Sequence, residues 1–181
     1  MPNWCNNNIE IHGPIEKIKA MYNEAVQDAN DETGLLNHLC PMPKELHDTT
    51  APSDGDNWYD WRVSNWSTKW EVSSEGLEFE DNGDGTGSIT GWFDSAWAPP
   101  IGACAHYGYR NEDVSIKLDY HEPGMAFVGR YTIENGVDDD LYYDYGGANS
   151  KTVRDLIGED MDDNWGISEN MAEWEEENEE A

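Results

Sequence analysis

Basic residues are scarce in this sequence. Its 181 residues include 10 Lys and Arg against 39 Asp and Glu, which gives a formal net charge of −29 at pH 7. A chain with this charge repels nucleic acids and anionic membranes, so we expect direct binding to neither. Three interpretations of the charge are open: a disordered acidic chain, a protein solvated for high salt, or a surface that imitates phosphate and attracts basic partners.

Cysteines and long apolar runs are also rare. The three cysteines, Cys5, Cys40 and Cys104, form no Cys-x-x-Cys pair, which argues against a disulfide framework and a zinc ribbon. No stretch approaches the roughly 20 apolar residues of a membrane span. The N-terminus lacks the basic region and apolar run of a signal peptide. We therefore expect an unprocessed protein in a reducing cytoplasm.

Aromatic residues, in contrast, are frequent. Nine Trp and nine Tyr argue against global disorder, and the length suits one domain with a proper core. Residues 155–181 differ from the rest because they carry twelve acidic residues and no basic one. We therefore divide the chain into a domain at 1–150 and an acidic C-terminal extension at 151–181.

The pattern of apolar residues and turns predicts alternating strands and helices. Ile9 and Ile11 alternate in a strand over 4–12, and apolar residues at every third or fourth position predict a helix over 15–29. The other predicted elements are strands over 70–81 and 88–97 around the turn 82–87, a helix over 101–109, and strands over 113–121, 126–134 and 141–145.

This order is that of a ferredoxin-like split β-α-β sandwich. The predicted fold is thus α+β, with an additional C-terminal hairpin and an acidic C-terminal helix or tail. Residues 30–70 form an insertion, which is Trp-rich at 57–70. An unrelated antiparallel sheet with helices would share most of these elements, and it remains the alternative.

The Trp-rich segment 57–70, NWYDWRVSNWSTKW, is a candidate ligand site. On a helix, Arg62, Asn65 and Lys69 share one face that tryptophans surround. Arg offers a bidentate fork, Asn donates and accepts hydrogen bonds, and Trp offers a stacking plane. The competing interpretation is that the rings cover the sheet and that the basic side chains pair with carboxylates. The candidate ligand-binding residues are Trp61, Arg62, Asn65, Trp66 and Lys69.

Other polar clusters predict no metal, cofactor or catalytic site. The turn 82–87 resembles a calcium loop but lacks the final Glu that the ion needs, so it predicts a hairpin. His38, Cys40 and His47 follow no four-ligand zinc pattern. The segment FDSAWAPP predicts a rigid corner in which Asp94 or the next serine caps or binds. Nothing in the sequence requires an enzyme.

The acidic extension has two interpretations of its own. Ile167, Met171 and Trp174 lie four and three residues apart, which predicts a short amphipathic helix that docks on the domain or awaits a partner. The other interpretation is a solvating tail. A helix would place carboxylates at steps of about 1.5 Å, comparable with the charge spacing of nucleic acid. The candidate partner-binding residues are Glu173, Glu175, Glu176, Glu177, Glu179 and Glu180.

Four longer motifs stand out: MPNWCNNNIEI at the N-terminus, WYDWR followed by NW-S-TKW, then FDSAWAPP and EPGMAFVG. Together they resemble the YubB ferredoxin-like family, small proteins of unknown function carried by bacteriophages and plasmids. The resemblance covers most of residues 1–133 and leaves the acidic extension outside. This chain has Ser67 where the family usually has Gly. The resemblance implies a ferredoxin-like sandwich and a mobile-element origin, and it brings no catalytic residues.

These observations predict a non-enzymatic accessory protein of a phage or plasmid in the cytoplasm of the host cell. Its expected partner is a basic host protein that handles nucleic acid or serves in defence, bound through DNA mimicry by the acidic surface and extension. The alternative is a small-molecule or nucleotide-binding module, or an enzyme, that uses the Trp-rich segment.

Overall fold

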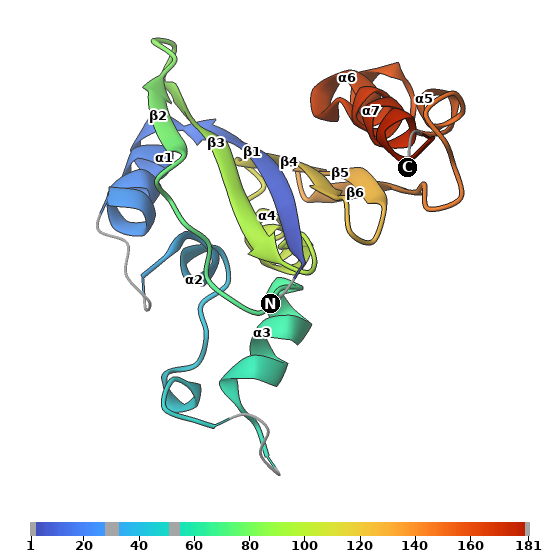
Figure 1. Ribbon diagram of the computed structural model, residues 1–181. Coiled ribbons are helices and arrows are strands. Elements are labelled where there is room, and N and C mark those ends of the chain that lie inside the picture. Colours follow the sequence, from blue (N-terminus) through green and yellow to red (C-terminus); the bar gives the residue numbers. More distant parts are fainter. Residues whose placement is uncertain (1–2, 28–32, 51–54, 180–181) are drawn as a thin grey trace.

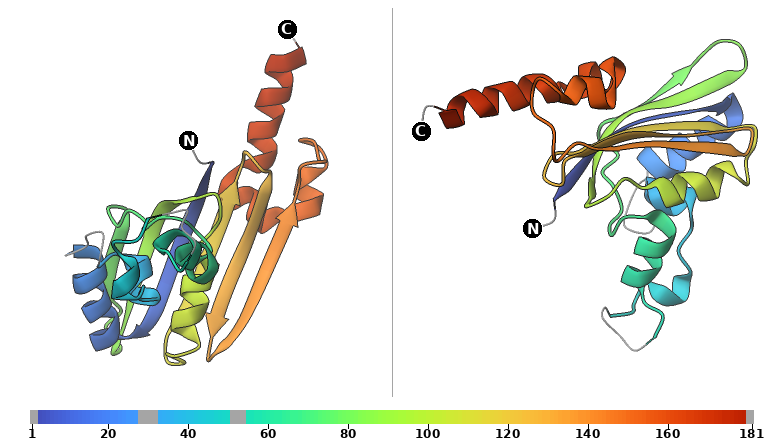
Figure 2. Two further views of the ribbon diagram at one scale, coloured as in Figure 1. Left: turned by 90° about the horizontal axis from the view of Figure 1, so that it is seen from below. Right: turned by 90° about the vertical axis from the view of Figure 1, so that its right-hand side faces the viewer.

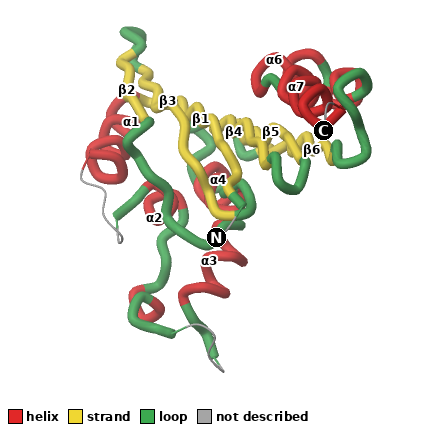
Figure 3. Tube along the Cα trace, in the orientation of Figure 1, coloured by secondary structure: helices red, strands yellow, loops and turns green. Residues whose placement is uncertain are grey.

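The computed structural model describes residues 3–27, 33–50 and 55–179, and it contains a six-stranded antiparallel sheet (Figures 1 and 3). The strands follow one another across the sheet in the order β2-β3-β1-β4-β5-β6. The first four have the arrangement expected of a split β-α-β sandwich, and β5 and β6 add the C-terminal hairpin. The strands are β1 (Trp4–Pro14), β2 (Leu77–Asp81), β3 (Thr86–Ala96), β4 (Ser115–Glu122), β5 (Phe127–Glu134) and β6 (Val137–Asp144).

The two faces of the sheet differ in polarity. In β1, Cys5, Ile9 and Ile11 are buried on the face that helices cover, whereas Asn8 and Glu10 point the other way and are exposed. Side chains alternate along a strand, so a one-residue shift in register would exchange these two sets. The alternation therefore defines a helix-covered face and a second face that is largely polar, which we call the open face.

Helices cover one face of the sheet (Figure 1). α1 (Ile15–Tyr22) and α4 (Ile101–Gly108) pack there, and α2 (Leu35–Leu39) and α3 (Trp58–Trp66) lie on the same side. Their apolar residues join those of the strands in one large core cluster. Ile18, Met21 and Cys104 are fully buried in it.

Three C-terminal helices pack on the opposite, open face, over the end of the sheet formed by β5 and β6 (Figure 1). They are α5 (Val153–Ile157), α6 (Glu159–Trp165) and α7 (Ile167–Glu179). Val128 of β5 meets Val153, Ile157 and Ile167 in a second hydrophobic cluster. Figure 2 shows that α7 extends beyond the ends of the strands. The sequence left open whether the extension is a helix or a tail. Its described residues form helices.

β6 forms one edge of the sheet and is rich in aspartate. Asp138 and Asp140 accept hydrogen bonds from the hydroxyls of Tyr131 of β5 (3.3 Å) and Tyr120 of β4 (2.8 Å). Burial, and secondarily the carboxylate, raises the pKa of both tyrosines. Every residue from Val137 to Tyr142 is exposed. The edge therefore presents a row of carboxylates.

Several predicted boundaries change. The strand predicted over 70–81 begins only at Leu77, because Glu71 turns toward α2 and accepts hydrogen bonds from the backbone N–H of Leu36 and Asn37. The helix predicted over 15–29 is α-helical to Tyr22 and continues as a π-helix (Asn23–Gln27); its last two predicted residues lie outside the described residues. The insertion contains α2, a 3-10 turn (Lys44–Leu46) and α3.

Trp66 tests the position of the core. It is fully buried, so Trp66→Ala should lower the free energy of unfolding by about 3–5 kcal/mol, measured by urea denaturation. Trp174→Ala is the matched control, because that side chain is 65% exposed and its loss should cost less than about 0.5 kcal/mol. Equal losses for the two variants would contradict the placement of α3.

Candidate functional site

The Trp-rich segment forms α3 and the turn that follows. Asn57 begins the helix, since its side-chain oxygen accepts a hydrogen bond from the backbone N–H of Asp60 (3.0 Å). The helix ends where Ser67 takes a φ of 70°, in the left-handed region. Lys69 therefore lies beyond the helix, and the prediction that it shares a helical face with Arg62 and Asn65 is wrong.

Arg62 lies between two indole rings of its own helix. Its guanidinium carbon is 5.4 Å from the ring centroid of Trp58 and 4.7 Å from that of Trp66, which are cation–π distances. Trp66 is buried and donates its indole N–H to the backbone oxygen of Cys40 (2.7 Å). Trp61 packs against the same core. The helix thus uses its aromatic residues mainly for packing.

Lys69 is surrounded by aromatic rings of the chain itself. Its ammonium nitrogen lies 4.3 Å from the ring centroid of Trp70, 5.2 Å from that of Trp97 and 5.7 Å from that of Tyr59. Asn65 donates its amide to the backbone oxygen of Trp61, one turn earlier (2.8 Å). The five candidate residues of this segment therefore do not converge on one surface.

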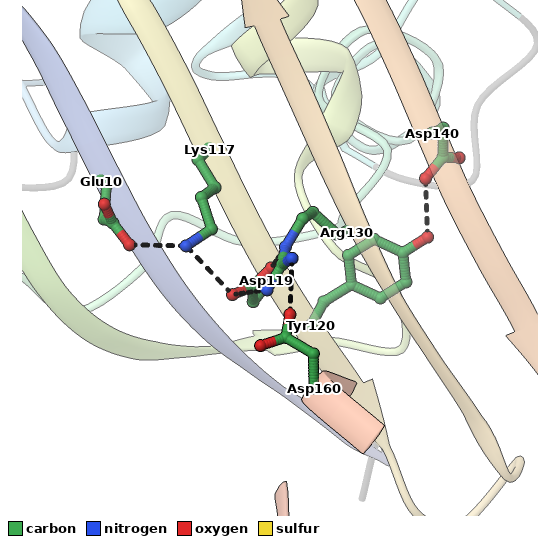
Figure 4. Close-up of polar contacts among 7 residues, drawn as sticks. All are labelled: Glu10, Lys117, Asp119, Tyr120, Arg130, Asp140 and Asp160. Carbon is green, nitrogen blue, oxygen red and sulfur yellow. Dashed lines mark hydrogen bonds and ion pairs between the residues drawn. The ribbon is translucent and has the colours of Figure 1, made fainter. Parts of the chain in front are cut away.

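A chain of ion pairs crosses the open face (Figure 4). Lys117 of β4 pairs with Glu10 of β1 (2.8 Å) and lies 3.6 Å from a carboxylate oxygen of Asp119. Arg130 of β5 binds the buried Asp119 through two nitrogens (2.5 and 3.0 Å) and reaches Asp160 of α6 (2.8 Å). The hydrogen bonds to the carboxylates raise the pKa of Arg130, so this cation stays charged. The same arginine links the sheet to the C-terminal helices.

Asp162 organises the C-terminal helices internally. Its buried carboxylate accepts hydrogen bonds from the backbone N–H (2.7 Å) and hydroxyl (2.6 Å) of Ser168, in the first turn of α7, and pairs with Arg154 (2.8 Å). Burial opposes ionisation, but these hydrogen bonds and Arg154 outweigh it and lower the pKa of Asp162. The start of α7 is therefore held to α5 and α6.

His121 joins the sheet to these helices at their hydrophobic base. Its Nε2 lies 2.6 Å from the hydroxyl of Tyr145, and its ring centroid is 5.5 Å from that of Trp165. Burial lowers the pKa of His121 to about 4. The imidazole is therefore neutral at pH 7.

The candidate glutamates of α7 divide into two groups. Glu173, Glu176 and Glu177 are exposed. Glu175 instead turns toward Ser150 and accepts hydrogen bonds from its backbone N–H (2.9 Å) and hydroxyl (2.6 Å), which lower the pKa of Glu175. Glu179 is the last residue of the helix, and Glu180 lies outside the described residues.

Two clefts of the open face involve residues that sequence reasoning passed over, among them Asn6, Asn8, Trp92 and Trp165. They come from β1, β3 and α6, which are far apart in the sequence. The local sequence feature that could have pointed to these clefts is the set of polar residues that alternate with apolar ones in β1. That pattern is equally typical of a strand with one face in water.

The described ranges contain no group of three or more His, Cys, Asp and Glu residues that could hold a metal ion. His38, Cys40 and His47 are among the residues searched. Within the same ranges, no helix is long and apolar enough to cross a membrane.

The strand order and the paired helices define a ferredoxin-like domain of the α+β class. Residues 65–180 match the family described as "Ferredoxin-like domain in Api92-like protein", and the chain belongs to this family. The match includes the C-terminal helices, which the resemblance drawn from residues 1–133 left out. The fold is also similar to the crystal structure of the protein Api92 from Yersinia pseudotuberculosis, with 10% sequence identity and a TM-score of 0.48 over 82% of this chain and 99% of that one. No curated protein sequence matches the chain.

Removal of the central arginine should destabilise the protein. Arg130→Met leaves the buried Asp119 without its main partner, so we expect a loss of about 3–5 kcal/mol in urea denaturation. Lys17→Met is the control, because its pair with Asp113 is largely exposed and should contribute at most about 1 kcal/mol. Similar small losses for both variants would contradict the bridging role of Arg130.

His121 should make stability depend on pH. Its folded pKa of about 4 lies below the value of about 6.5 for the unfolded chain, so the unfolded chain binds more protons between these values. The free energy of unfolding should therefore fall as the pH is lowered from about 6.5 to about 4, by at most about 3 kcal/mol.

The matched variant is His121→Phe. Its unfolding free energy, measured over the same pH range, should fall less steeply than that of the natural protein. Identical slopes would show that His121 is not buried in its neutral form.

Proposed function

We propose that this protein is a non-enzymatic accessory protein of a bacteriophage or plasmid. In the cytoplasm of the host cell it binds a basic protein that handles nucleic acid or serves in defence. The observation that carries the proposal is α7, a helix that extends beyond the sheet and presents exposed carboxylates with no basic side chain (Figure 2).

The exposed surface of α7 combines charge with one large apolar side chain. Trp174 is 65% exposed, and the exposed Glu173, Glu176 and Glu177 belong to the same helix. Tryptophan is enriched among the residues that contribute most to protein–protein binding, and surrounding charges set the choice of partner and its rate of association. This combination favours a protein partner with a basic surface and an apolar pocket.

Four of the basic side chains are engaged away from α7, so they do not neutralise its charge. Lys17, Lys117, Arg130 and Arg154 all form ion pairs with carboxylates outside α7. The ion pairs found among the described residues involve none of the three exposed glutamates. A surplus of unpaired negative charge attracts a basic partner over several ångströms at low salt, and salt screens it.

The spacing of the carboxylates supports mimicry of nucleic acid. Glu169, Glu173 and Glu176 are separated by four and three residues, which places their Cα atoms about 6 and 4.5 Å apart along the helix axis. One strand of duplex DNA carries a charge about every 3.4 Å of axis, so α7 offers a sparser row of the same sign. Its anchoring by Asp162 and Glu175 keeps this row in place.

The alternative, a ligand site in the Trp-rich segment, has less support. Arg62 and Trp58 line a cavity of about 480 Å³, but Asp48 and Glu71 line it too. Their carboxylates oppose the binding of an anion such as a nucleotide. The acidic helix is therefore the candidate that we carry forward.

Neutralisation of α7 should abolish binding. The triple variant Glu173→Gln, Glu176→Gln, Glu177→Gln removes three charges without touching Asp162 or Glu175. We expect it to capture at least tenfold less of the basic proteins that the natural chain retains from a bacterial lysate, as measured by quantitative mass spectrometry. The captured partner should also dissociate at high salt, and duplex DNA should compete with the natural chain for the partner.

The control is a second triple variant with the same change in net charge: Glu16→Gln, Glu45→Gln, Glu112→Gln. These side chains are exposed and belong to α1, the 3-10 turn and the segment after α4. The control should retain its partners. If both variants lost equal amounts of captured partner, net charge alone would explain the binding. If the α7 variant captured as much partner as the natural chain, α7 would not be the binding surface.

A further inference from the structure

Two clefts lie on either side of Trp92 on the open face. The first, of about 420 Å³, lies between β1, β3 and the end of α6, and its lining includes Asn6, Asn8, Asp119, Asn164 and Trp165. The second, of about 620 Å³, is lined in part by Trp4, Glu71, Glu75 and Glu78. Trp92, Phe93 and Asp94 line both. We call the two clefts together the Trp92 groove.

The Trp92 groove is acidic throughout. Five carboxylates line it, and the described lining residues include no Lys, Arg or His. Asp119 is neutralised by Arg130, and Glu71 is held by backbone N–H groups. Glu75, Glu78 and Asp94 take part in none of the ion pairs found among the described residues. A groove with this charge selects a cation and repels phosphate and carboxylate ligands.

Trp92 and Asp94 stand in one strand on the same face, two residues apart. Asp94 accepts a hydrogen bond from the side-chain amide of Asn6 (2.8 Å) through Oδ1, and the hydrogen bonds among the described residues leave its Oδ2 unused. Trp92 is 65% exposed, although an added Cβ at Gly76 would lie only 3.2 Å from its indole ring. Glycine at 76 therefore allows the indole of Trp92 to pack against the backbone of Gly76, while much of the ring remains exposed to solvent.

This combination suits a guanidinium group better than an ammonium group. The guanidinium of arginine is planar, stacks on an indole ring and forms two parallel hydrogen bonds to one carboxylate. It also donates to amide oxygens, which Asn6, Asn8 and Asn164 offer around the first cleft. We propose that the Trp92 groove binds an arginine side chain of a basic polypeptide, with the guanidinium stacked on Trp92 and paired with Asp94.

The groove lies at the base of the acidic helix. Trp165 ends α6, and α7 starts at Ile167, so the wall of the first cleft leads directly into α7. A single partner can therefore contact both surfaces. The inference rests on the proposed function, because it assumes that the arginine belongs to a basic partner protein. Binding to the groove can nevertheless be tested without that partner.

The test titrates the full chain, labelled with ¹⁵N, with the blocked tripeptide acetyl-Gly-Arg-Gly-amide at low salt. The indole N–H signal of Trp92 should shift with increasing peptide. The analogue with lysine should bind at least fivefold more weakly, and the analogue with citrulline, which has the same shape without the charge, should cause no shift. Equal binding of the three peptides would overturn the proposal, and so would a shift caused by simple sugars but not by the arginine peptide.

Variants locate the site. Trp92→Ala and Asp94→Asn should each weaken binding of the arginine peptide at least tenfold, measured by isothermal titration calorimetry because Trp92→Ala removes the reporting indole. Circular dichroism should show that both variants are folded. Tyr142→Ala and Asp155→Asn are matched controls at exposed positions outside the groove and outside α7, and they should bind within twofold of the natural chain. Unchanged binding in the groove variants would overturn the proposal.

The two proposals can fail separately. If the α7 variant keeps every protein partner but the peptide binds at Trp92, the proposed function fails and the groove stands. If the α7 variant loses its partner but the arginine peptide leaves the Trp92 signal unchanged, the groove fails and the proposed function stands.

Discussion

Arg130 is the side chain on which the arrangement of the open face depends. It binds a buried carboxylate from the neighbouring strand and a carboxylate from α6, so one cation joins segments 30 residues apart. The position of α6 over the sheet creates the first cleft, and the end of α6 sets where α7 begins. Arg130 tolerates little displacement, because the buried Asp119 would otherwise remain in the interior uncompensated. Both candidate binding surfaces therefore share one electrostatic anchor.

A chain with 39 acidic and 10 basic residues cannot neutralise its carboxylates by ion pairs. Several buried or half-buried acids use backbone N–H groups instead. Glu71 binds the N–H groups of Leu36 and Asn37, and Glu122 binds those of Gly124 and Met125. Asp162 adds the N–H group of Ser168 to its ion pair with Arg154. A backbone donor stabilises the charged form of a carboxylate without adding a basic residue. These buried acids therefore have hydrogen-bond donors, although burial still raises the pKa of Glu71.

The sequence predicts the fold better than the site. Alternation in β1 and the Asn-Gly and Asp-Gly turns identify the strands, because both depend on local chemistry. The sequence of residues 70–76 is typical of a strand, but Glu71 accepts a hydrogen bond from a backbone N–H group of α2. A local sequence pattern cannot predict this contact. The Trp-rich segment resembles a ligand site because it combines basic side chains with aromatic rings, yet Arg62 and Lys69 contact rings of the chain itself. The Trp92 groove requires contacts between β3, β1 and α6, which spacing cannot reveal.

The row of aspartates on β6 has a consequence for self-association. An edge strand offers unpaired backbone groups to the edge strand of another molecule, and such pairing leads to aggregation. Asp138, Asp139 and Asp140 are consecutive and exposed on this edge, so pairing with the same edge of a second copy would bring carboxylates together. The cost of that repulsion protects an otherwise exposed strand, and the negative charge proposed to attract a basic partner also keeps copies of this chain apart.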